Sequence, residues 1–100
     1  MNYQVIIENL KSDSYLITDH ARKRMAERGI STTVLENALI QGEIIESYED
    51  DEPCPSFLIL SIAMDIYLHI VIGLYADHLR IITCYHPDEN EWTNYRERRR

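Results

Sequence analysis

The sequence has little of what marks secreted, disulfide-linked or metal-binding proteins. Its two cysteines, Cys54 and Cys84, form no CxxC pair, the four histidines are scattered singly, and the N-terminus shows no secretory signal. The ligand spacing of a zinc site and a nucleotide-binding glycine loop are both missing. We therefore expect no metal, no cofactor and a reducing, cytoplasmic location.

Long apolar runs and structure-breaking residues are also scarce. The longest apolar run, FLILSIAM at residues 57–64, is far shorter than the roughly 20 residues of a membrane helix. Only three glycines and three prolines occur, and 45% of the residues are hydrophobic, which is typical of a globular chain. One folded domain spanning residues 1–100 is the expectation.

Positive charge is in short supply over the chain as a whole. Seventeen acidic residues against ten basic ones give a net charge of −7, which disfavours non-specific binding of phosphate by the whole surface. The charges are unevenly spread, however. Acids gather at residues 46–52, and bases gather at residues 20–28 and 96–100, so a local basic patch is expected on an acidic molecule.

The hydrophobic period divides the chain into a helical half and a strand half. Apolar spacing and capping residues predict helices over residues 3–10, 19–28 and 32–41, with Thr18 and Ser31 as N-caps and Gly29 as a stop. Runs rich in Ile, Leu, Val and Tyr predict strands at residues 43–48, 57–64, 66–75 and 79–85. The tail, residues 87–100, is expected to hold a short helix. These elements indicate an α+β fold, with the N-terminal helices on one face of a four-stranded, mainly antiparallel sheet and the other face free for a site.

The helix over residues 19–28 carries the most informative charges. On a helical wheel Ala21 and Met25 define the buried direction, Arg28 falls within that arc, Arg24 borders it and His20 lies just beyond. Buried arginines need partners. Two interpretations stay open: the arginines form structural ion pairs, or they line an anion-binding cleft between the helix and the sheet.

Two further titratable groups are expected on the sheet. Strand alternation separates His69 from the strongly apolar face that contains Ile70, and Tyr85 with His86 ends the last strand, where side chains reach the rim. A lone strand histidine is more often a hydrogen-bonded structural residue than a functional one. Tyr85 is equally suited to packing at the rim or to meeting a ligand.

Several motifs together resemble a known family. HARKRMAERGIS, a helix followed by GEIIE, an acidic loop with prolines, LHIV, and TCYHPDENEW resemble the DUF4258 family of uncharacterised bacterial and archaeal proteins from about Tyr15 to Trp92. That family is similar to small toxins of the RelE and BrnT types. The resemblance implies a RelE-like fold and a metal-independent ribonuclease, the toxin of a type II toxin–antitoxin system. Its partners would be RNA, including ribosome-bound mRNA, and an antitoxin of zinc-ribbon or helix-turn-helix type.

Carried onto this sequence, the resemblance assigns roles in RNA transesterification. His20 is the leading candidate for the base, His69 or Tyr85 for the acid, and Arg24 with Arg28 for clamps on the phosphate. Besides Arg28, further RNA contacts are expected from Arg80 and His86. His86 stands where related sequences usually have an acidic residue. Two alternatives stay open: a non-enzymatic RNA- or protein-binding module of the same fold, and a degenerate, antitoxin-like interaction partner.

Overall fold

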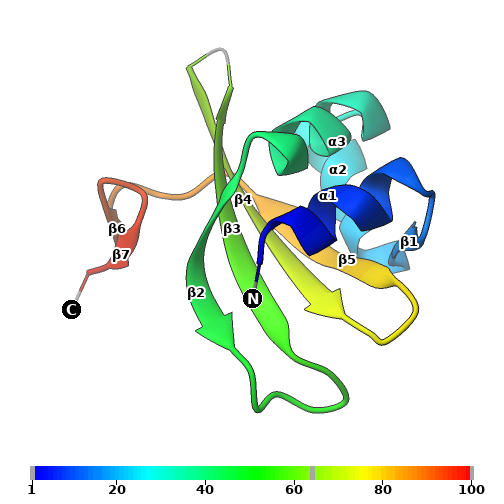
Figure 1. Ribbon diagram of the computed structural model, residues 1–100. Helices are drawn as coiled ribbons and strands as arrows, with labels where there is room; N and C mark the ends of the chain where they lie inside the picture. The colour runs from blue at the N-terminus through cyan, green and yellow to red at the C-terminus, as the bar shows by residue number, and fades with distance from the viewer. Residues whose placement is uncertain (1, 64, 100) are drawn as a thin grey trace.

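The computed structural model of the chain describes residues 2–63 and 65–99. A layer of helices, α1 (Gln4–Lys11), α2 (Asp19–Arg28) and α3 (Thr32–Ile40), lies against one face of a sheet (Figure 1). The sheet strands are β1 (Tyr15–Ile17), β2 (Glu43–Tyr48), β3 (Ser56–Ala63), β4 (Ile66–Leu74) and β5 (Leu79–Tyr85). The predicted α+β class, with helices on one face of a mainly antiparallel sheet, is confirmed.

The sheet has five strands in the order β1-β5-β4-β3-β2. The four predicted strands form its antiparallel part, with Ile59 opposite Ile70 in the centre and Cys84 on the other side of Ile70. The predicted count of four is wrong because β1 adds a fifth strand, parallel to β5, with Tyr15 opposite Leu79. Three residues are too few to show strand alternation in a sequence, so only the exposed edge of β5 identifies them as a strand.

Helix boundaries follow the capping residues. The Thr18 hydroxyl accepts a hydrogen bond from the Ala21 amide at the start of α2, and Ser31 does the same for α3. Gly29 ends α2 with a φ of 67°, a left-handed conformation that glycine adopts without steric cost. The predicted bounds of 19–28 for the second helix are confirmed.

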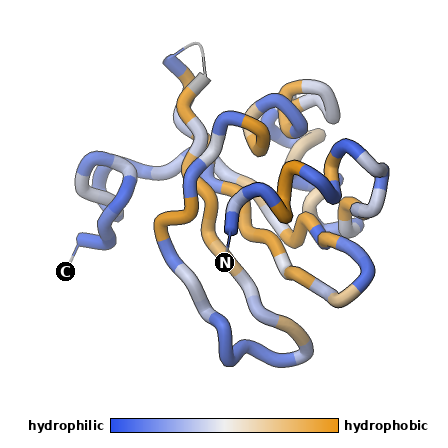
Figure 2. The backbone as a smooth tube through the Cα atoms, viewed as in Figure 1, coloured by the Kyte–Doolittle hydropathy of each residue, from blue (hydrophilic) through white to orange (hydrophobic). Residues whose placement is uncertain are grey.

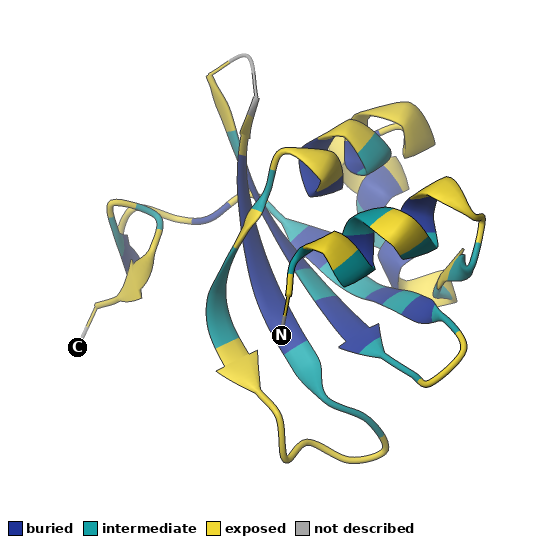
Figure 3. Ribbon diagram, in the orientation of Figure 1, coloured by how far each residue is buried: buried dark blue, intermediate teal, exposed yellow. Residues whose placement is uncertain are grey.

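The hydrophobic core lies between the helices and the sheet. Figure 2 shows the apolar stretches concentrated in the strands, and Figure 3 shows buried residues along the strand centres and on the inner sides of the helices. The core cluster is formed by side chains of all three helices and of strands β3, β4 and β5, including Ile6, Leu35, Ile59, Ile70 and Ile81. No helix in the described part of the chain is long and apolar enough to cross a membrane.

The C-terminal tail is a strand hairpin, so the predicted short helix is wrong. Strands β6 (Trp92–Thr93) and β7 (Glu97–Arg98) pair antiparallel and form what we call the C-terminal hairpin, residues 92–98. Asn94 and Tyr95 have φ values of 52° and 65° at its turn, a backbone that closes a tight hairpin and that helical residues do not adopt. In Figure 1 the hairpin lies on the side of the sheet away from the helices.

Candidate functional site

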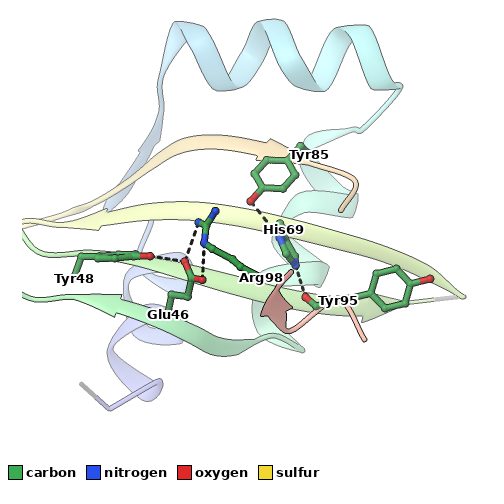
Figure 4. Close-up of polar contacts among 6 residues, drawn as sticks. All are labelled: Glu46, Tyr48, His69, Tyr85, Tyr95 and Arg98. Atoms are coloured by element: carbon green, nitrogen blue, oxygen red, sulfur yellow. Dashed lines mark hydrogen bonds and ion pairs between the residues drawn. The ribbon is translucent and has the colours of Figure 1, made fainter. Parts of the chain in front are cut away.

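The face of the sheet turned away from the helices, here called the free face, carries a cluster centred on His69. The His69 side chain is fully buried, with the ring of Trp92 at 4.4 Å between centroids. Its Nε2 lies 2.6 Å from the carbonyl oxygen of Tyr95 and its Nδ1 lies 3.2 Å from the hydroxyl of Tyr85. Figure 4 shows that both contacts reach the imidazole from opposite sides.

The hydrogen bonds of His69 fix which nitrogen carries its proton. Burial lowers the pKa of His69, and this outweighs the opposing effects of the Tyr95 carbonyl and the Glu46 carboxylate. The ring is therefore neutral near pH 7. A carbonyl oxygen can only accept, so Nε2–H donates to Tyr95 and the bare Nδ1 accepts from the Tyr85 hydroxyl. Burial also raises the pKa of Tyr85, against the positive charge of Arg98, so the phenol keeps its proton.

A carboxylate–guanidinium pair lies next to this contact. Nε of Arg98 donates to Oε2 of Glu46 at 2.9 Å and Nη2 donates to Oε1 at 3.0 Å, a bidentate geometry. The hydroxyl of Tyr48 donates to the same carboxylate at 2.5 Å. Partial burial alone would raise the pKa of Glu46, but the hydrogen bonds from Arg98 and Tyr48 together lower it, so the carboxylate is ionised.

Two hollows on the free face join these groups. The first, the free-face pocket, has a volume of about 350 Å³ and is lined by Glu46, Tyr48, Tyr85 and Arg98 among others. The second, of about 320 Å³, contains Arg80. The walls of both hollows share three residues, Asp51, Ser56 and Val71. Together they make one groove across the free face, called the free-face groove below.

Arg80 in the second hollow contacts an aromatic ring and a histidine. Its guanidinium carbon lies 4.5 Å from the centre of the Tyr75 ring, and its Nε donates to Nε2 of His78 at 3.0 Å. Tyr75 and His78 are themselves stacked, with 4.7 Å between ring centroids. A planar cation on an aromatic face is a combination that also stacks nucleobases.

The basic helix buries Ala21 and Met25 as predicted, but the prediction that Arg28 lies within the buried arc is wrong. His20 and Arg28 are exposed, and Arg24 is partly exposed and pairs with Glu27 at 2.9 Å. The inward direction on the wheel is filled by the apolar side chains of Ala21 and Met25 alone, where α2 packs beside β5. For Arg24 the ion-pair interpretation describes the structure.

The predicted site residues thus fall into two groups. His69, Tyr85 and Arg80 lie on the free face. Arg28 lies near Cys84 on the helix-covered face: burial raises the pKa of the Cys84 thiol, and the charge of Arg28 opposes this effect. His86 is exposed just beyond β5, with Nδ1 at 3.1 Å from the carbonyl oxygen of Tyr67.

Three site residues were missed by the sequence analysis: Glu46, Tyr48 and Arg98. The signals were present in the acidic run and in the basic terminus, but both runs suggested solvated charge patches. Alternation in β2 places Glu46 and Tyr48 on one face, and only the hairpin brings Arg98 to them. In the described ranges, no three His, Cys, Asp or Glu side chains gather in a way that would hold a metal ion.

Comparisons with known proteins identify the chain at the level of a family. No curated protein and no solved structure matches it. Residues 17–86 match the family described as "Domain of unknown function (DUF4258)". This match covers α2, α3 and the four strands β2 to β5, including His69 and Tyr85. The chain therefore belongs to the DUF4258 family.

Proposed function

We propose that this protein is a metal-independent endoribonuclease with a RelE-like fold, the toxin of a type II toxin–antitoxin pair, whose active site is the free-face pocket. The observation that carries the proposal is the contact between the Tyr85 hydroxyl and Nδ1 of a neutral His69. A phenol whose proton already points to a bare imidazole nitrogen can accept a proton from a substrate hydroxyl and pass on its own.

The proposed reaction is transesterification. The 2′-hydroxyl of RNA gives its proton to the Tyr85 oxygen while the Tyr85 proton moves to Nδ1 of His69. The 2′-oxygen attacks the adjacent phosphorus, and the bond to the 5′-oxygen breaks. The resulting imidazolium is stabilised by the Tyr95 carbonyl and by the carboxylate of Glu46. The products are a 2′,3′-cyclic phosphate and an RNA with a 5′-hydroxyl.

Arg98 and Tyr48 supply the remaining groups. Arg98 uses Nε and Nη2 for Glu46, which leaves Nη1 to donate to the phosphate as negative charge accumulates. Tyr48 lines the same pocket and protonates the departing 5′-oxygen. Its hydrogen bond to Glu46 raises the pKa of Tyr48, partly opposed by the charge of Arg98, so the phenol carries its proton before the step. The proton that His69 gains leaves through the Tyr85 hydroxyl to solvent, and Tyr48 regains a proton from solvent, which completes the cycle.

The free-face groove fits a single-stranded substrate. Arg80 on its aromatic support lies in the hollow next to the pocket, where it can bind a neighbouring phosphate or base. The helix α2, whose exposed basic side chains include His20 and Arg28, packs beside β5. In the proposal these side chains contact the RNA backbone, together with Arg24 and His86, outside the reacting centre.

Cleavage of a defined single-stranded RNA tests the proposal. We expect wild-type protein to release a 2′,3′-cyclic phosphate and to leave a substrate with a single 2′-deoxy sugar at the cleavage position uncut. Tyr85→Phe keeps the packing but removes the hydroxyl, so the rate should fall by about 10²–10⁴-fold. Tyr15→Phe is the matched control, because Tyr15 bonds to Glu36 away from the pocket. Absence of cleavage by folded wild-type protein would refute the enzyme.

The proposed toxin role has its own test in cells. Induction of the wild-type chain should arrest growth, whereas Tyr85→Phe should not. A small protein encoded next to this chain, of zinc-ribbon or helix-turn-helix type, should restore growth and bind the purified wild type. Growth unaffected by a soluble, RNA-cleaving wild-type chain would separate the ribonuclease from the toxin role and overturn only the latter.

The second candidate function is a non-enzymatic RNA- or protein-binding module. The observation that favours it is that His69 is fully buried with both ring nitrogens hydrogen-bonded, as expected for a structural residue holding the C-terminal hairpin. Such a module would bind RNA or a partner protein without generating new RNA ends, and Tyr85→Phe would leave that affinity unchanged.

A further inference from the structure

A second hollow with different chemistry lies on the helix side of the sheet, between α3 and the β3–β4 hairpin. It has a volume of about 330 Å³, within the lower range of small-molecule sites. Figure 1 shows the hairpin extending past α3 at this end of the molecule. The hollow is lined by residues of α3 and its C-cap, of β3 and of β4, none of them charged: Val34, Asn37, Ala38, Gln41, Ser61, Ile62, Ile66 and Leu68.

The hollow has a buried floor and an apolar, accessible rim. Ala38, Ser61 and Leu68 are buried, whereas Val34 and Ile66 are 48% and 52% exposed. Large aliphatic side chains left half in water around a hollow gain free energy when an apolar group covers them. A ligand of matching chemistry would therefore be bound mainly by burial of these side chains.

Ser61 adds one unpaired polar group to this mainly apolar hollow. Among the buried side-chain nitrogen and oxygen atoms of residues 2–63 and 65–99, Oγ of Ser61 is the one without a hydrogen-bond partner. A buried hydroxyl that makes no hydrogen bond is costly and is uncommon in folded proteins. The other polar lining groups are the side-chain amides of Asn37 in α3 and of Gln41 just after it, both exposed residues, so the side chains of the buried floor offer Ser61 no partner.

We infer that this hollow is a binding site for a small uncharged molecule with an apolar body and one hydroxyl or carbonyl group, which hydrogen-bonds to Ser61 Oγ after a rotation of the serine side chain. The apolar rim favours a ligand with an apolar body, and the unpaired hydroxyl of Ser61 favours a ligand with one polar group. The uncharged lining excludes nucleotides and carboxylic acids, because a buried charge would have no partner there. This site is independent of the proposed RNA chemistry on the opposite face.

A pair of matched probes tests the inference. Benzyl alcohol and toluene have nearly the same apolar body, and benzyl alcohol alone carries a hydroxyl. We expect both to shift the NMR methyl signals of Val34, Ile66 and Leu68, with benzyl alcohol binding about fivefold more tightly, the equivalent of one hydrogen bond of about 1 kcal/mol. Ser61→Ala should abolish that preference but keep toluene binding. Ser47→Ala, on the sheet edge away from the hollow, should leave the preference intact.

Each other outcome would overturn the inference. Methyl shifts absent up to the solubility limit of both probes would show that the hollow binds nothing of this class. An unchanged preference in Ser61→Ala would remove the role of the hydroxyl. Methyl shifts that depend on the protein concentration and not on the probe concentration, together with a dimer in analytical ultracentrifugation, would show that a second copy of the chain covers this surface. Val34→Phe, which fills the rim, provides a further check because it should block both probes.

Discussion

The C-terminal hairpin covers His69 mainly through one side chain, and Trp92→Ala should release it. Trp92 is almost completely buried, its ring meets the His69 ring edge-on at 4.4 Å, and Arg98 lies over it at 4.7 Å. Truncating a buried tryptophan costs about 3–5 kcal/mol. Because Trp92 is not part of the core cluster between helices and sheet, this loss should fall on hairpin docking before global folding.

The other hairpin contacts are individually weaker, including the hydrogen bond from His69 Nε2 to the Tyr95 carbonyl, which contributes about 0.5–1.5 kcal/mol. The ion pairs Arg96–Glu43 and Arg98–Glu46 have arginine side chains that are 45% and 61% exposed, and exposed pairs contribute about 0–1 kcal/mol each. The stacking of Tyr95 on Tyr67, with 3.7 Å between centroids, adds about 0.5–1.5 kcal/mol. A two-stranded hairpin is barely stable by itself, so it should detach in Trp92→Ala.

The readout is the titration of His69 by NMR. Burial is the largest influence on this residue and lowers its pKa, so release of the hairpin should raise the pKa towards the ordinary value of about 6.5. Trp92→Phe, which keeps an aromatic ring against His69, should shift the pKa less. Arg96→Ala, which removes only an exposed pair, should not shift it. A folded Trp92→Ala protein whose His69 titrates as in the wild type would refute the docking role of the tryptophan.

Three further predictions concern stability and are measured by urea denaturation. Ser61→Ala should stabilise the ligand-free protein by about 1 kcal/mol, because it removes an unpaired buried hydroxyl; a loss of stability would show that the hydroxyl has a partner. Gly42→Ala should destabilise by about 1–3 kcal/mol, since the new Cβ would lie 2.5 Å from Cγ2 of Ile59; unchanged stability would contradict this packing. Arg98 is among the groups that lower the pKa of Glu46 in the folded state. The wild type should therefore be more stable than Glu46→Gln at pH values above 4.5, the ordinary pKa of a glutamate. This difference in unfolding free energy should vanish as the pH falls through the lowered pKa of Glu46. A difference between the two proteins that grows on acidification would contradict the ion pair.

Local signals in the sequence were enough for most individual elements. Thr18 and Gly29 bracket α2 because an N-cap hydroxyl and a left-handed C-terminal glycine act within one helical turn. In β4, His69 and Ile70 lie on opposite faces of the sheet because successive side chains of a strand alternate between the two faces. These features depend on neighbours in the chain, so the one-dimensional pattern contains them.

Long-range contacts were the part that the sequence could not supply. Tyr15–Ile17 is a strand only because the edge of β5 lies beside it. The tail became a hairpin over the free face because Trp92 gains burial against His69 and Arg98 reaches Glu46, a residue 52 positions away. The wheel of α2 could not tell that Arg28 stays exposed within the apparent buried arc, since the width of the contact with β5 is set by tertiary packing.

The sequence by itself determined the α+β class, the limits of α2, the faces of β4, and His69 and Tyr85 as candidates. Tertiary structure decided which charged groups accompany them: Glu46, Tyr48 and Arg98 meet on the free face, while Arg24 pairs with Glu27. The physical reason is range. Capping and alternation act between residues a few positions apart, whereas burial and ion pairing depend on which distant segments the fold brings into contact.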